Sequence, residues 1–221
     1  MDFGFWQNRW STAQIGFHQS VTNPHLTEHA DWLAPTPTDI LVPLCGKSRD
    51  MAWLASRGNA VVGIEFVAEA ARAFFEENGV HFTERDDAIS HVLVGENVTI
   101  RVGDFFEIAP RMTNAFAAVF DRAALVACKP NTREAYVASI SGCMKPGGRA
   151  LVVTFDYDGA FEGPPFSVTE QNTRALWQPY GSIEKVAHVD ITSESARMVE
   201  RGATQVREQA WQFQKRALTI P

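Results

Sequence analysis

The sequence lacks the features that mark membrane, secreted and nucleic-acid-binding proteins. No apolar run approaches the roughly 18 residues that span a bilayer, and the opening stretch MDFGFWQNRW has no apolar core like that of a secretory signal. A net charge of −6 leaves no basic excess for binding nucleic acid. Three scattered cysteines argue against a disulfide framework or a zinc site. We therefore expect a cytoplasmic protein with no metal, membrane or nucleic-acid partner.

What the chain does have is enough apolar sequence for one well-filled core. It contains 221 residues, of which 45% are hydrophobic, and no repeat or linker divides them. We expect a single domain over residues 1–221, and a monomer. Residues 1–38 are helical in pattern, and the stretch PTPTD separates them from the rest of the chain. The chain thus divides into an N-terminal helical cover, 1–38, and an α/β core, 39–221.

Within the predicted core, β-branched runs alternate with segments of helical periodicity. The pattern predicts strands at 39–44, 60–66, 97–104, 115–122 and 150–157, and helices at 48–58, 67–79 and 131–144. Ser48 is placed to cap the first of these helices and Gly58 to end it. Residues 80–95 show no regular pattern, whereas 182–218 alternate as a terminal antiparallel pair would.

This alternation predicts an α/β fold with a mostly parallel central sheet and helices on both faces. Parallel neighbours need a crossover connection, which is usually a helix. Such sheets bind ligands outside the carboxyl ends of their strands. The residues that follow the predicted strands are therefore the candidates for a site: 44–47, Glu65, 103–105, Asp121 with Arg122, and the residues from Asp156 onward.

The turn after the first strand, in DILVPLCGKSRDM, lacks both familiar phosphate-binding motifs. A P-loop would need a glycine at Leu41, and a dinucleotide-binding turn needs three glycines where only Gly46 is present. Glu65 ends the second strand, where a carboxylate can accept hydrogen bonds from ribose hydroxyls. These features suit a nucleoside without phosphates, such as S-adenosylmethionine, with Asp104 at the adenine amino group and Phe105 against the ring. An NAD-binding or non-catalytic α/β domain stays open at this point.

Seven segments, in order along nearly the whole chain, resemble the thiopurine S-methyltransferase family. The most specific are VPLCGKSRDMAWL at 42–54 and GPPFSV at 163–168. The others are WQNRW at 6–10, GFHQ at 16–19, VVGIE at 61–65, GDFF at 103–106 and FDRAALVA at 120–127. The short N-terminus is similar to that of the bacterial branch of the family.

The resemblance implies a class I methyltransferase fold, S-adenosylmethionine as the cofactor, and a small aromatic thiol as the acceptor. Bacterial relatives are also linked to methylation of selenium and tellurium oxyanions, and so to tellurite resistance. The residues it assigns are Trp10, Leu44, Glu65, Asp104, Phe105 and Arg122 for the cofactor, Phe17 and Arg122 for the substrate, and Arg122 and Arg197 for catalysis.

The chemistry of methyl transfer explains why these residue types suffice. The protein has to align a nucleophile with the methyl carbon and exclude water, while aromatic faces such as Trp10 or Trp6 attract the sulfonium. An acidic aromatic thiol is already deprotonated near neutral pH, so that no strong base is needed, and an arginine such as Arg122 suits the resulting anion. Cys45 is interpreted as a buried apolar residue and not as a nucleophile.

A second acceptor class stays open beside the first. Halide and thiol methyltransferases of the same superfamily share the cofactor but have a glycine-richer first turn, so PLCGKSRDM favours a thiopurine-type enzyme. An NAD-binding domain is disfavoured by the missing glycines and by the aromatic N-terminus.

Overall fold

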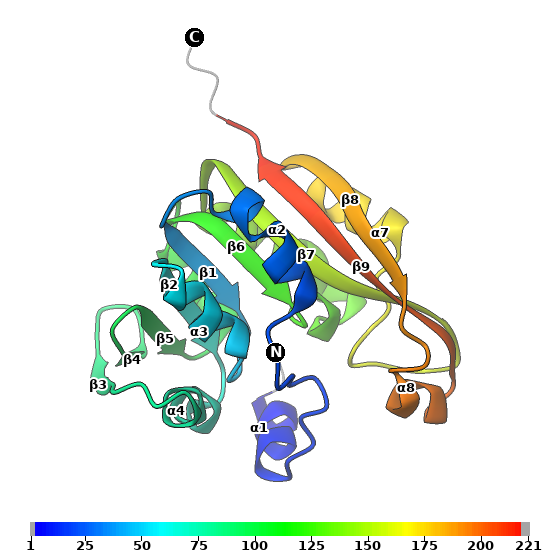
Figure 1. Cartoon of the computed structure of the whole chain (residues 1–221), viewed down its shortest axis with the longest axis horizontal. Helices are drawn as coiled ribbons and strands as arrows, with labels where there is room; N and C mark the ends of the chain where they lie inside the picture. The colour runs from blue at the N-terminus through cyan, green and yellow to red at the C-terminus, as the bar shows by residue number, and fades with distance from the viewer. Residues whose placement is uncertain (1–2, 218–221) are drawn as a thin grey trace.

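The computed structural model describes residues 3–217 and is built around one twisted sheet (Figure 1). The first two residues of the predicted cover and residue 218 of the predicted terminal pair lie outside the described part of the chain. Two helices precede the sheet, α1 (Phe3–Ser11) and α2 (Pro24–Leu33). Asn23 caps α2, since its side chain accepts hydrogen bonds from the backbone N–H groups of His25 and Leu26.

The centre of the sheet is parallel, as predicted. In spatial order it contains β5 (Val98–Val102), β2 (Ala60–Glu65), β1 (Asp39–Pro43), β6 (Phe116–Arg122) and β7 (Met144–Gly159). Beside β7 lie two antiparallel strands, β9 (Ala203–Lys215) and then β8 (Gly181–Asp190), which are the predicted terminal pair. A short helix, α8 (Ala196–Glu200), connects these two strands.

The prediction of irregular structure for residues 80–95 is wrong. They form an antiparallel hairpin, β3 (Thr83–Asp86) and β4 (His91–Val94), which extends the sheet beyond β5. The first of these strands is polar at all four positions and exposed on both faces, so it has no apolar alternation to detect. With the hairpin included, four strand pairings are parallel and four antiparallel, and parallel pairing is confined to the centre.

The helices of the core begin and end close to their predicted bounds. They are α3 (Arg49–Ser56), α4 (Ala68–Glu77) and α6 (Arg133–Cys143). Three further helices were not predicted: α5 (Phe105–Ile108), α7 (Glu170–Trp177) and α8. Ser48 caps α3 by accepting a hydrogen bond from the Asp50 N–H, and Gly58 follows the helix at a φ of +84°. Both local signals therefore work as expected.

Two apolar layers cover the two faces of the sheet. One packs α5, α6 and α7 against it around Tyr136, Trp177 and Trp211, and the other packs α2, α3 and α4 around Met51 and Phe74. In contrast, α1 contains no fully buried residue and lies beyond the carboxyl ends of β1 and β6 (Figure 1). Within residues 3–217, no helix is long and apolar enough to cross a bilayer.

Candidate ligand-binding cavity

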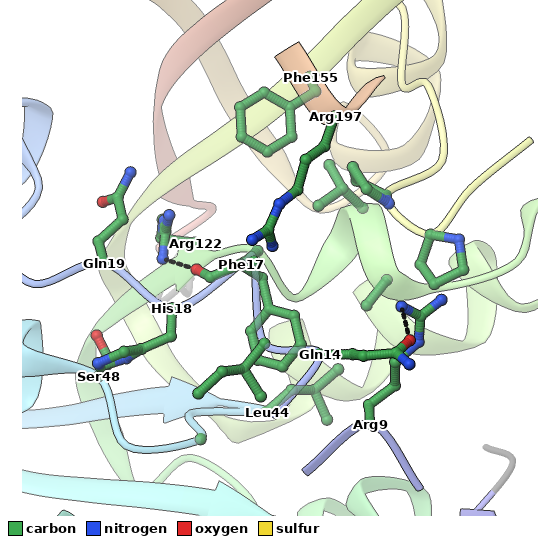
Figure 2. A pocket seen from close by; sticks show the side chains of 18 of the residues that line it. Arg9, Gln14, Phe17, His18, Gln19, Leu44, Ser48, Arg122, Phe155 and Arg197 are labelled. Carbon is green, nitrogen blue, oxygen red and sulfur yellow. Dashed lines mark hydrogen bonds between the residues drawn. The ribbon is translucent and has the colours of Figure 1, made fainter. Parts of the chain in front are cut away.

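A cavity of about 1220 Å³ lies at the carboxyl ends of the parallel strands. Its floor is formed by the residues that follow β1, β2 and β6, and its roof by α1, the segment 12–19 and α8 (Figure 2). Six predicted site residues line it: Trp10, Phe17, Leu44, Glu65, Arg122 and Arg197. Trp6 lines it as well. The structure thus brings together residues separated by almost the full length of the chain.

The turn after β1 is shaped to admit an aromatic ring. Leu44 and Gly46 both have a positive φ, +47° and +52°, a conformation that is strained for leucine and easy for glycine. A Cβ atom on Gly46 would lie 2.9 Å from Cζ2 of Trp10. The single glycine of the turn therefore allows Trp10 of α1 to close directly over it.

Glu65 holds this turn from the end of β2. Its Oε2 accepts a hydrogen bond from the Gly46 N–H and its Oε1 one from the Val67 N–H, each at 2.8 Å. Burial raises the pKa of the Glu65 carboxyl to about 7, although these backbone donors lower it. One carboxylate thus ties together the turn and the connection that leads to α4, while it still lines the cavity.

Arg122 places a partly buried cation in the cavity from the end of β6. Its Nη1 donates to the backbone oxygen of Phe17 at 2.8 Å (Figure 2), and its buried Nε has no partner among residues 3–217. Burial lowers the pKa of the guanidinium, and the nearby Asp50 and Glu208 raise it. Arginine remains charged under such conditions, so a cation without a paired carboxylate in the described chain lines the cavity.

An aromatic cluster connects the roof to the floor. The ring of Phe17 packs edge-on against Trp10 at 5.5 Å and against Trp6 at 5.7 Å between centroids. Because the Phe17 backbone also accepts from Arg122, the cluster is fixed to β6 as well as to the Gly46 turn. Roles for these rings in binding stay predictions.

Arg197 reaches the same cluster from α8. A Cβ atom on Gly16 would lie 2.6 Å from Nη1 of Arg197, so the guanidinium lies against the backbone next to Phe17 (Figure 2). Within the described chain it makes no hydrogen bond or ion pair. A second cation without an acidic partner therefore faces the cavity.

Asp104 and Phe105 do not line the cavity. The Asp104 carboxylate accepts a hydrogen bond from the Phe106 N–H and so caps α5. The Phe105 side chain is fully buried against Tyr136, with 5.0 Å between ring centroids. The sequence pattern correctly placed both residues after β5, but Phe105 is a core residue here, and its predicted contact with an adenine ring has no counterpart in the cavity.

Sequence reasoning missed a polar group at one end of the cavity. Glu208 of β9 lines it, and its Oε1 lies 3.0 Å from Nε2 of His25 on α2. Asp50 accepts hydrogen bonds from the Asn23 N–H and the Ser48 hydroxyl, and burial raises the pKa of its carboxyl. Glu208 lies in the polar stretch REQ of β9, on the face opposite Trp211, so the strand carries no sequence signal for a buried acid.

The chemistry of the cavity is therefore that of a site for an organic ligand. Among residues 3–217, no group of three or more histidine, cysteine, aspartate and glutamate side chains is placed to hold a metal ion. Cys45 lines the cavity but is buried, and burial raises the pKa of its thiol well above the usual range. A thiol in this state is a poor nucleophile, which agrees with its interpretation as an apolar residue.

Comparison with known proteins extends these observations. The family described as thiopurine S-methyltransferase (TPMT) matches residues 1–216. The thiopurine S-methyltransferase of Pseudomonas putida strain F1 is 37% identical over 220 residues, which cover 97% of this chain and 100% of that protein. The corresponding protein of Azotobacter vinelandii is 36% identical over 214 residues and covers 96% and 98% of the two chains.

Solved structures show the same fold at much lower identity. A 1,6-didemethyltoxoflavin-N1-methyltransferase from Burkholderia thailandensis, with bound 1,6-didemethyltoxoflavin and S-adenosylhomocysteine, superposes with a TM-score of 0.68 at 16% identity and covers 97% of this chain and 87% of that one. A SAM-dependent methyltransferase from Methanosarcina mazei gives a TM-score of 0.61 at 15% identity, with coverage of 89% and 99%. The predicted class I methyltransferase fold is confirmed. With a family model that matches residues 1–216 and relatives that are 36–37% identical over nearly their full length, the chain belongs to the thiopurine S-methyltransferase family.

Proposed function

We propose that this protein transfers the methyl group of S-adenosylmethionine to the sulfur of a small aromatic or heterocyclic thiol. The observation that carries the proposal is the presence, in one cavity, of the Glu65 carboxylate and the partly buried Arg122 guanidinium, under a roof formed by Trp10 and Phe17. Family membership favours this function over an NAD-binding domain and over the halide and thiol methyltransferases.

The residues around the turn after β1 fit a nucleoside with a positively charged sulfur. Glu65 accepts the ribose hydroxyls, because a buried carboxylate offers lone pairs beyond the two backbone bonds it already makes. Trp10 offers its ring face to a sulfonium, and Leu44 contributes backbone at the turn. The bound cofactor supplies an electrophilic methyl group. We keep Asp104, which caps α5 next to the cavity and does not line it, as a prediction for the adenine amino group.

The acceptor side is formed by cations and apolar rings. Arg122 lines the cavity with a guanidinium that suits a thiolate, and Arg197 brings a second positive charge over Gly16. Phe17 lies between them and offers its ring to an aromatic acceptor. The protein thus holds the anion and excludes water, and no covalent bond forms between the protein and either reactant. The same two arginines also suit an oxyanion of selenium or tellurium, which we propose as a second acceptor class.

A panel of acceptors with a labelled methyl donor tests the proposal. Purified protein, S-adenosylmethionine with a labelled methyl group, and separate reactions with aromatic thiols, aliphatic thiols, iodide, selenite and tellurite would be analysed for labelled products. We expect methylated aromatic thiols. Label on iodide alone, or tryptophan fluorescence that responds to NAD and not to S-adenosylmethionine, would overturn the proposal. Cytoplasmic localisation and a monomeric state stay predictions.

A further inference from the structure

The acidic residue Glu208 has an unused oxygen that opens on the cavity. It lies on β9 directly across from Phe155 of β7, which also lines the cavity. Its Oε1 is hydrogen-bonded to Nε2 of His25. Its Oε2 has no hydrogen-bond partner among residues 3–217 and is not fully enclosed by other atoms. The residue as a whole is only 8% exposed. The open oxygen therefore faces the cavity and not bulk water.

His25 fixes the orientation of this carboxylate. It projects from α2, is 6% exposed, and its Nδ1 is buried without a partner in the described chain. Because an ionised carboxylate can only accept, the contact with Glu208 Oε1 requires the tautomer of His25 that has its proton on Nε2. A side chain held in this way loses little rotamer freedom when it acts on a ligand.

The charged groups around Glu208 keep the cavity suited to an anionic sulfur. The nearby charges of Asp50 and Glu208 raise the pKa of Arg122 on β6. Arg122 forms no ion pair with either of them within the described residues. Asp50 reaches the region from α3, and His25 from α2. A cation from β6 and an acceptor oxygen from β9, on either side of β7, thus line one cavity without forming an ion pair.

The geometry points to Glu208 as a general base for thiols that are protonated at neutral pH, an inference that rests on the proposed thiol methyltransferase function. In this step the S–H bond breaks, the proton moves to Oε2 of Glu208, and the electron pair stays on sulfur beside Arg122. The sulfur then forms its bond to the methyl carbon as the carbon–sulfonium bond breaks, which leaves two neutral thioethers. The proton on Glu208 passes to water when the products leave.

This role widens the range of acceptors and is not needed for every one. A strongly acidic aromatic thiol arrives as the thiolate and needs only the arginine. A weakly acidic thiol must lose its proton in the site, and a positioned base typically contributes about 10²–10⁴-fold to such a step. Removal of Glu208 should therefore lower the rate most for the least acidic thiols and least for the most acidic ones.

The test is the E208Q variant with a series of thiols of falling acidity: 4-nitrothiophenol, thiophenol, 4-methoxythiophenol and benzyl mercaptan. The amide oxygen of glutamine can still accept from His25, so the fold should be retained. We expect kcat/KM for benzyl mercaptan to fall roughly 100-fold or more and that for 4-nitrothiophenol to change less than about threefold. E208D, which keeps a carboxylate, should recover part of the loss. E194Q is the matched control, because Glu194 lies at the rim with its carboxylate bound to the Ser193 hydroxyl.

Several results would overturn the inference. One is an equal loss for all four thiols, which would assign Glu208 to the support of Arg122. Another is a loss confined to S-adenosylmethionine affinity by calorimetry, which would assign it to the cofactor. Unchanged rates with every thiol would remove it from the site. A wild-type protein that methylates no thiol would overturn the proposed function as well, whereas the first three results would leave that function standing.

Discussion

The clearest prediction from the site concerns how the affinity for S-adenosylmethionine depends on pH. Burial raises the pKa of the Glu65 carboxyl to about 7, so much of it is protonated in slightly acidic solution. The ionised form can accept from the ribose hydroxyls as well as from the Gly46 and Val67 N–H groups, whereas the protonated form gives up an acceptor site to its own proton. We therefore expect affinity to rise with pH and to level off above about 7.

The size of the effect follows from linkage. Below the pKa of Glu65 in the ligand-free protein, each unit by which pH falls should weaken binding by up to about tenfold, or about 1.4 kcal/mol. This holds if the carboxylate of the complex stays ionised. E65Q removes the titrating group but keeps one acceptor oxygen. Its affinity should vary little with pH and lie about 1–3 kcal/mol below that of the wild type in alkaline solution, the cost of a lost hydrogen bond to a charged group.

Isothermal titration calorimetry of wild type, E65Q and the rim control E194Q, from about pH 5 to about pH 9, measures these quantities. A wild-type affinity that is flat, or that falls as pH rises, would refute the assignment of Glu65 to the ribose. So would an E65Q profile with the same slope as the wild type.

The same carboxyl group should make the ligand-free protein less stable as pH rises. Its pKa in the folded state lies above its ordinary value of 4.5. The stabilisation from protonated Glu65 is therefore fully present below about pH 4.5 and is lost as pH rises through about 7. A rise from 4.5 to about 7 corresponds to about 3 kcal/mol in the free energy of unfolding. The difference between wild type and E65Q in denaturant titrations isolates this contribution, and a difference that does not change with pH would contradict it.

Three further predictions concern the turn, the buried arginine and the roof. G46A should weaken S-adenosylmethionine binding at least tenfold in calorimetry, because a residue with a Cβ atom is strained at φ +52° and its methyl group would meet Trp10. The control G142A, in open space on α6, should leave binding unchanged. Equal effects of the two variants would contradict the reasoning. R122K should lower kcat/KM for an acidic aromatic thiol moderately and R122M more strongly, since lysine keeps the charge but not the planar fork; wild-type kinetics for both would exclude Arg122 from the site. Deletion of residues 1–19 should preserve the far-ultraviolet circular dichroism of a folded sheet but abolish methyl transfer, because α1 has no fully buried residue; an unfolded product would show that the segment is structural.

The parts of the fold that local sequence controls were predictable. The stretch 39–55 forms a strand, a turn and a helix because an apolar run, one glycine and a capping serine act over a few residues each. The positions of Glu65 and Arg122 at strand ends followed from the same pattern. The hairpin at 83–94 could not be predicted in this way, because its polar first strand is held by pairing with the rest of the sheet and not by its own periodicity.

The site shows the same division between local and long-range effects. Asp104 was placed correctly after β5, but the direction of Phe105 depends on the start of α5 and on Tyr136, which comes from a distant helix. The pair of His25 and Glu208 joins residues 183 positions apart. Neither residue alone carries a recognisable motif, so only the packing of α2 onto the sheet brings this pair to the cavity.

The roof of the cavity is held chiefly by residues that also belong to the site. Trp10 closes over Gly46, the Phe17 backbone accepts from Arg122, and Gly16 lies against Arg197. Because α1 has no fully buried side chain, these contacts and the edge-on packing of Phe3 against Phe66, with 5.0 Å between ring centroids, are what fix it. Any ligand that engages Arg122 or the Gly46 turn therefore acts on the groups that hold the roof in place. Substrate binding and the exclusion of water, which methyl transfer needs together, are linked through the same few contacts.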